Sequence, residues 1–114
     1  MKTYKIYYHI PSEEMFSSAD ASVDHTDLEL VNELVKYVRT SEDQISIYAN
    51  DSMVRVEIYK GADDDAYDVE LHNARDGVNY FRAFSKSNLF PLDRGVLDAF
   101  ILDPKKYSFE AESF

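Results

Sequence analysis

Strict alternation of apolar and polar residues between positions 45 and 71 is the feature that most constrains the fold. Residues 45–49 read Ile-Ser-Ile-Tyr-Ala, residues 53–58 read Met-Val-Arg-Val-Glu-Ile, and residues 67–72 read Tyr-Asp-Val-Glu-Leu-His. Successive side chains of a strand point to opposite faces, so a period of two is typical of strands with one buried and one solvated face. The pattern therefore predicts three consecutive antiparallel strands.

The residues between the first two segments predict how those segments pair. Asn50 and Asp51 tolerate a positive φ and suit a two-residue turn. This turn pairs apolar residues with each other on the buried face, Ile47 with Val54 and Ile45 with Val56. A slip of one residue would move every apolar side chain to the wrong face. The pattern and the turn chemistry therefore favour the same register.

The third segment is expected to pair with the second through the turn-rich connection at residues 60–66. Pairing apolar residues puts Arg55 opposite Glu70, and it puts Glu57 opposite Asp68, where like charges destabilise a sheet. The simpler interpretation is that both carboxylates are solvated, or that the register differs by two. The functional interpretation is an anionic patch for a cationic partner. The simpler one is preferred, because surface charge is normal on an exposed antiparallel face.

Residues 27–40 are predicted to form an amphipathic helix. Thr26 and Glu29 have the spacing of a capping box, in which each side chain bonds the backbone near the other. Apolar residues recur at helical spacing and should pack on the sheet. These residues are Leu28, Val31, Leu34, Val35 and Val38.

The remaining segments mix strand, loop and helix signals. Residues 3–10 alternate and predict a first strand, and residues 12–25 predict a polar loop. Residues 78–85 fit a strand or a helix, and the strand is preferred because the segment is rich in aromatic residues and follows an Asp-Gly turn. Residues 86–92 are expected to form a loop.

A second helix is expected over residues 94–102, with Asp93 as its cap. Its expected buried residues are Val96, Leu97, Phe100 and Ile101. Residues 105–114 fit either a last strand or a tail. Together the elements predict a single α+β domain over residues 1–114, with a mainly antiparallel sheet of four to six strands and two helices packed on one face. The crossover after the first strand leaves room for one parallel pairing.

Charge and composition limit the classes of partner. The chain has 22 acidic and 12 basic residues and a net charge of −10, which argues against direct binding to nucleic acid or to an anionic membrane. The same charge would steer a basic protein toward the molecule. The chain has no cysteine, which excludes disulfides and thiolate metal sites. The N-terminus lacks the long apolar run of a signal peptide, so a cytoplasmic location is the default expectation.

Motifs for metal binding and catalysis are weak. Asp63, Asp64 and Asp65 form an acidic turn, but the spacing of a calcium loop is not met. Neither a nucleophile elbow nor a phosphate-binding glycine loop occurs in the sequence. His25 and His72 lie among carboxylates and are the alternative candidates for a general base. No metal site and no cofactor is predicted.

Binding is the preferred function, because tyrosine is enriched at protein interfaces and carboxylates steer basic partners. The candidate binding residues are Tyr48, Glu57, Tyr59, Asp63, Asp64, Asp65, Asp68 and Glu70. The sequence thus predicts a non-enzymatic acidic module that binds a basic protein surface as an inhibitor, an immunity-type protein or a nucleic-acid mimic. The alternatives are a small enzyme with a histidine base and a homo-oligomeric structural domain, such as a dimer.

Overall fold

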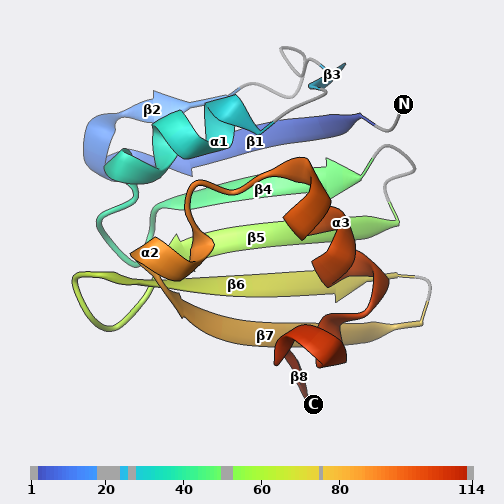
Figure 1. The fold of residues 1–114 in the computed structure, drawn as a ribbon. Helices are drawn as coiled ribbons and strands as arrows, with labels where there is room; N and C mark the ends of the chain where they lie inside the picture. The colour runs from blue at the N-terminus through green and yellow to red at the C-terminus, as the bar shows by residue number, and fades with distance from the viewer. Residues whose placement is uncertain (1–2, 18–23, 26–27, 50–52, 75, 113–114) are drawn as a thin grey trace.

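The computed structural model describes residues 3–17, 24–25, 28–49, 53–74 and 76–112, which form one sheet with helices on one of its faces (Figure 1). The strands are β1 (Tyr4–Ile10), β2 (Met15–Phe16), β3 (Asp24–His25), β4 (Gln44–Ala49), β5 (Val54–Lys60), β6 (Ala66–Asn73), β7 (Val78–Ser85) and β8 (Glu110–Glu112). The α-helices are α1 (Glu29–Leu34), α2 (Lys86–Leu89) and α3 (Arg94–Leu102). The 3-10 helices are η1 (Pro11–Glu13), η3 (Val35–Tyr37) and η4 (Pro104–Tyr107).

The sheet has eight strands, in the order β2-β1-β4-β5-β6-β7-β8, with β3 also paired to β1. Each of the described strand pairs is antiparallel, as predicted. The sheet is larger than the predicted four to six strands, because β2, β3 and β8 contain only two or three residues each. β2 and β3 are too short to carry readable alternation, whereas β8 lies within residues 105–114, which fitted either a last strand or a tail. The crossover after the first strand left room for one parallel pairing, but β1 and β4 are antiparallel, although α1 lies between them in the chain.

The register of the central strands differs from the prediction by two residues. Ile47 faces Val56 rather than Val54, so the connection after Ala49 is longer than a two-residue turn. Asn50 and Asp51, the predicted turn residues, lie outside the described residues. A shift of two keeps every side chain on its predicted face, because strand side chains alternate with a period of two. It changes which side chains meet.

The same shift occurs between β5 and β6. Glu57 faces Glu70 rather than Asp68, and Arg55 faces His72 rather than Glu70. The like-charge contact foreseen in the sequence is therefore present, but with a different partner.

The first helix is shorter than the predicted range 27–40. It consists of α1, which ends at Leu34, followed by the 3-10 helix η3, which ends at Tyr37. The buried Asp43 carboxylate explains the end, because it accepts hydrogen bonds from the backbone N–H groups of Arg39 and Thr40, 3.0 and 2.9 Å away. Those groups are consequently not used to extend the helix. The Leu28 cap position has no side-chain capping bond, and Thr26 of the predicted capping box lies outside the described residues. All the predicted apolar face is buried, namely Leu28, Val31, Leu34, Val35 and Val38.

The C-terminal half follows the sequence signals more closely. Residues 78–85 form a strand, and Asp93 caps α3 by accepting a hydrogen bond from the backbone N–H of Val96. Leu97 and Phe100 are buried, as predicted, and Ile101 is partly buried, but Val96 was wrongly predicted to be buried, because it is 39% exposed. Residues 86–92, predicted as a loop, contain the short α2 and a cis peptide bond before Pro91. After α3 the chain forms η4 and then the edge strand β8.

The core lies between the helices and one face of the sheet. Its members come from the inward side of every long strand and from α1, α2 and α3. In Figure 1 the α-helices all lie on the viewer's side of the sheet, so no described helix covers the opposite face of the central strands. Among the described residues, the helices are too short or too polar to cross a membrane.

Candidate functional site: the open face of the sheet

Outward side chains form rows across the face of the sheet that the helices leave open, because antiparallel pairing places partners side by side. One row contains Lys5, Tyr48, Arg55, His72 and Asn79. The next row contains Tyr7, Ser46, Glu57, Glu70 and Phe81. A third row contains His9, Gln44, Tyr59, Asp68 and Ala83. Polar and aromatic groups therefore dominate this face.

The centre of the open face is a cluster of two carboxylates and an imidazole. Glu57 and Glu70 are direct cross-strand partners, and Glu57 is only 9% exposed. The Nε2 atom of His72 lies 3.1 Å from a carboxylate oxygen of Glu70 and 3.7 Å from one of Glu57. We call Glu57, Glu70 and His72 the carboxylate cluster.

Two neighbours orient the Glu57 carboxylate. The Nε atom of Arg55 lies 3.0 Å from its Oε1 atom, and the Tyr59 hydroxyl donates a hydrogen bond to its Oε2 atom. Burial, this hydrogen bond and the charges of Glu57 and Glu70 raise the pKa of Tyr59 well above its ordinary value, and Arg55 opposes them only in part. Tyr59 therefore remains a hydrogen-bond donor at physiological pH.

The carboxylate cluster can accept a cation. One oxygen from each glutamate and one nitrogen of His72 lie within 4.8 Å of one another. The three side chains rise from two paired strands, β5 and β6. Carboxylate oxygens and an imidazole nitrogen suit a divalent metal ion, whereas carboxylates alone suit an ammonium or guanidinium group.

The structure brings together five of the predicted binding residues on this face: Tyr48, Glu57, Tyr59, Asp68 and Glu70. Burial raises the pKa of Asp68, and the charge of Lys60 partly offsets that rise. The remaining three, Asp63, Asp64 and Asp65, lie in the exposed turn between β5 and β6. Lys60 organises this turn by donating from Nζ to the backbone carbonyl oxygens of Asp63 and Asp64, 2.6 and 2.8 Å away.

Sequence reasoning missed two members of the site. His72 was considered only as a general base beside Asn73, and Arg55 only as a partner of Glu70. A register shifted by two, which the sequence left open, would have placed both beside Glu57. The other candidate base, His25, pairs through its backbone with Tyr4, and its side chain lies outside what the structure describes.

A shallow depression of about 280 Å³ adjoins the carboxylate cluster on the open face. Its lining includes Tyr48, Arg55, His72 and Asn79, which belong to one cross-strand row. Beside it the rings of Tyr7 and Tyr48 meet edge to face, with centroids 5.3 Å apart. The open face thus offers both a hollow with polar and apolar lining and aromatic contact area.

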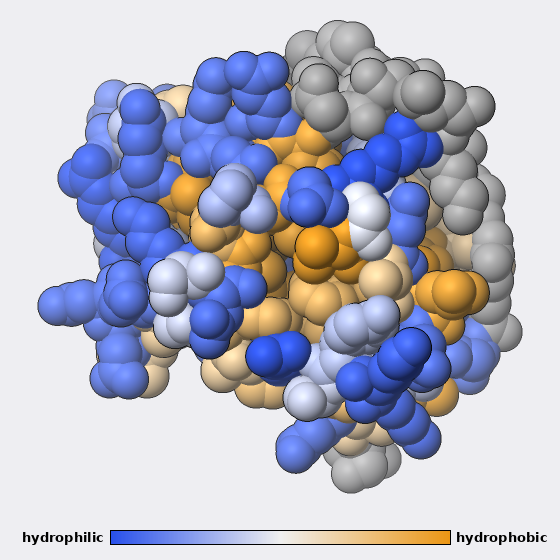
Figure 2. All heavy atoms as spheres, in the orientation of Figure 1, coloured by the Kyte–Doolittle hydropathy of each residue, from blue (hydrophilic) through white to orange (hydrophobic). Residues whose placement is uncertain are grey.

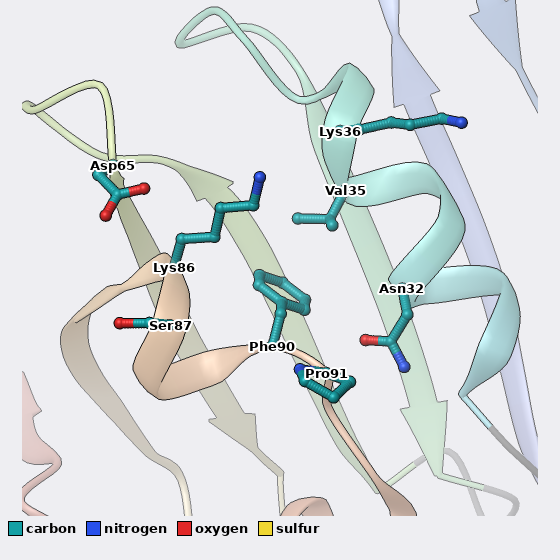
Figure 3. A pocket seen from close by; sticks show the side chains of 8 residues that line it. All are labelled: Asn32, Val35, Lys36, Asp65, Lys86, Ser87, Phe90 and Pro91. Carbon is teal, nitrogen blue, oxygen red and sulfur yellow. The ribbon is translucent and has the colours of Figure 1, made fainter.

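The helical face has a hollow of a different character. Figure 2 shows hydrophobic residues visible between α1 and the α2–α3 segment, with hydrophilic residues around them. One part of this band is a pocket of about 500 Å³ between α1 and α2 (Figure 3). The structure therefore has concavities on both sides of the sheet.

Comparison of the chain with protein-family models, with curated proteins and with solved structures finds no match. The function is therefore inferred from the geometry of the open face.

Proposed function

We propose that this protein is a non-enzymatic binding module that receives a basic surface of a partner protein on the open face of its sheet. The observation that carries the proposal is the direct pairing of Glu57 with Glu70. Like charges in this position destabilise a sheet, and burying a carboxylate adds a desolvation cost. A cation from a partner would offset both the repulsion between the two carboxylates and the desolvation cost.

Arg55 engages one carboxylate oxygen of the pair and leaves room for a second cation. Arg55 lies against the Oε1 atom of Glu57, while the Oε2 atoms of Glu57 and Glu70 both face His72. A lysine or arginine side chain that enters from solvent can reach the Oε2 atom of Glu70, because this side chain is 30% exposed, whereas the Oε2 atom of Glu57 already accepts the Tyr59 hydrogen bond. Charge-assisted hydrogen bonds to carboxylates are about twice as strong as neutral ones.

Tyrosines around the carboxylate cluster would supply the apolar part of the interface. Tyr7 and Tyr48 pack edge to face, and Tyr59 lies in the next cross-strand row. Tyrosine provides a large contact area with little loss of side-chain entropy, which is why it is common at binding hot spots. The net charge of −10 would accelerate association with a basic partner. An inhibitor, an immunity-type protein or a nucleic-acid mimic would act by occupying the partner's basic groove with this face.

A second candidate function is a small enzyme that uses His72 as a general base. The observation that favours it is the depression of about 280 Å³, which places His72 in a concave wall beside Glu57 and Glu70. The two functions differ in one measurable respect. An enzyme requires His72 itself, whereas a charge-steered binder requires the two carboxylates.

The proposal is tested by affinity capture from the native host. Immobilised protein is exposed to lysate at about 50 mM and about 500 mM salt, since screening weakens exposed charge pairs. The Glu57→Gln/Glu70→Gln variant is compared with Glu33→Gln/Glu42→Gln, which also removes two carboxylates, both from exposed positions. Circular dichroism confirms that each variant is folded.

The expected result is a basic protein captured at low salt by the wild type and by the Glu33→Gln/Glu42→Gln control, and lost with Glu57→Gln/Glu70→Gln. Failure to capture a basic protein at either salt concentration would overturn the proposal. So would equal losses for the two double variants, because total charge and not the open face would then explain capture.

A further inference from the structure

The pocket between α1 and α2 lies on the opposite side of the sheet from the open face. It is lined by Asn32, Val35, Lys36, Asp65, Lys86, Ser87, Phe90 and Pro91, and its volume is about 500 Å³. Pockets that bind small molecules measure roughly 300–1,000 Å³. The size suits a small organic ligand.

The floor of this pocket is apolar. Val35 is buried against the core, and the ring of Phe90 packs edge to face on the ring of Tyr67, with centroids 5.4 Å apart. Pro91 adds an exposed apolar wall. The Tyr67 hydroxyl donates a hydrogen bond of 3.4 Å to the backbone carbonyl oxygen of Val35, which ties the floor of the pocket to η3. An apolar ligand body would find a preformed surface here.

The charged side chains around the floor differ in where they point and in what they contact. Figure 3 shows the Lys86 side chain extending from α2 toward α1, whereas the Lys36 side chain points away. Within the described part of the chain, the Lys86 ammonium makes no ion pair and no hydrogen bond. Asp65 is the one acidic residue in the lining. Its backbone carbonyl accepts a hydrogen bond of 2.8 Å from the Lys86 backbone N–H, which fixes the base of the lysine.

We propose that this pocket binds a small amphipathic monoanion: a carboxylate carrying an aromatic or branched aliphatic body. The body lies on Val35, Phe90 and Pro91, and the carboxylate meets the Lys86 ammonium. The Lys36 ammonium lies over the ring of Tyr37 and points away, so the preference for an anion rests on the Lys86 ammonium, which extends toward α1. Asp65 and the net charge of −10 disfavour a second negative charge on the ligand.

The test uses three probes that share one body and differ in the head group: hydrocinnamate, hydrocinnamamide and phenylpropylamine. Each is titrated into isotope-labelled protein, and the backbone amide signals are followed by NMR. Hydrocinnamate is expected to shift the signals of Val35, Lys86, Ser87 and Phe90 and to bind most tightly. The neutral amide should bind about twofold to fivefold more weakly, which is the range of an exposed ion pair.

Three variants separate a specific charge contact from general attraction. Lys86→Gln should weaken hydrocinnamate binding about twofold to fivefold and leave binding of the amide unchanged. Lys105→Gln removes the same charge from an exposed position outside the pocket and should change neither. Asp65→Asn should strengthen hydrocinnamate binding, because it removes the carboxylate from the rim.

The proposal is overturned if hydrocinnamate shifts none of these signals. It is also overturned if the amide binds as tightly as the carboxylate, which would leave only an unspecific apolar surface. Tighter binding of phenylpropylamine would assign the pocket to cations through Asp65. None of these results bears on the open face, so a failure here is distinguishable from a failure of the proposed function.

Discussion

Glu57 and Glu70 lie directly opposite each other on adjacent strands, and Glu57 is only 9% exposed. Such a pair lowers the stability of the sheet unless other charges compensate. Arg55 lies close enough to do so in part. Functional surfaces commonly retain interactions that weaken the fold, because binding relieves them.

Neutralising Glu70 should stabilise the isolated protein. We expect Glu70→Gln to raise the free energy of unfolding at neutral pH by about 0.5–1 kcal/mol, because the like-charge pair disappears while the amide oxygen can still accept a hydrogen bond. The measurement is denaturant unfolding followed by circular dichroism. Glu42→Gln, at an exposed position, is the control and should change stability much less. A destabilised Glu70→Gln variant would show that the compensating charge of Arg55 outweighs the repulsion.

Asp43 should link stability to pH. Burial alone would raise the pKa of its carboxyl, but hydrogen bonds from Ser12, Arg39 and Thr40 hold this pKa well below its ordinary value. A carboxyl in the unfolded chain titrates near pH 4, at about 3.9. The stabilisation is therefore present above that pH and is lost as the pH falls toward the lower pKa of the folded state.

The Asp43→Asn variant tests whether the charged Asp43 carboxylate stabilises the fold above about pH 4. At neutral pH it should lower the free energy of unfolding by about 2–3 kcal/mol, since buried backbone N–H groups lose a charged acceptor. The difference in free energy of unfolding between wild type and variant should become smaller as the pH falls below about 4. Urea unfolding across that pH range measures both. A gap that stays constant, or that widens in acid, would contradict the assignment of a charged Asp43.

The side chain of Asn32 joins α1 to the segment before α3. It donates to the backbone carbonyl of Leu92 at 2.9 Å and accepts from the backbone N–H of Leu92 at 2.8 Å. Asn32→Ala would leave both backbone groups without these partners, and we expect it to lower the free energy of unfolding by about 1–3 kcal/mol. Thermal unfolding measures the loss. Asn88→Ala, which removes the same amide from an exposed position on α2, is the control and should have little effect on stability.

The sequence predicted which side of the sheet each side chain faces better than it predicted which side chains meet across adjacent strands. Alternation placed Val56, Val69 and Leu71 inward and Glu57 and Glu70 outward, as observed. A register shifted by two preserves that alternation, so no hydrophobic signal distinguishes the two pairings. The connection after Ala49 decides between them, and Asn-Asp without a glycine fits more than one loop length. For this reason the carboxylate cluster could not be predicted.

Long elements were also easier to predict than short ones. The buried face of α1 follows from helical spacing, and the Asp93 cap of α3 from local turn chemistry. The helix end depended on Asp43, whose carboxylate folds back onto Arg39 and Thr40. That contact is a tertiary interaction, which helix propensity does not predict. Strands of two or three residues, such as β2 and β8, depend on their neighbours in the same way.

The central claim is that the paired carboxylates of Glu57 and Glu70 form the point at which a basic partner binds. The most direct measurement is calorimetric titration of the captured partner at several salt concentrations, using wild type, Glu57→Gln/Glu70→Gln and Glu33→Gln/Glu42→Gln. We predict that the first double variant binds at least about tenfold more weakly, as expected when a charged hydrogen-bonded pair is broken, and with a weaker salt dependence. The control should retain nearly wild-type affinity. Equal affinities for the wild type and Glu57→Gln/Glu70→Gln would contradict the account.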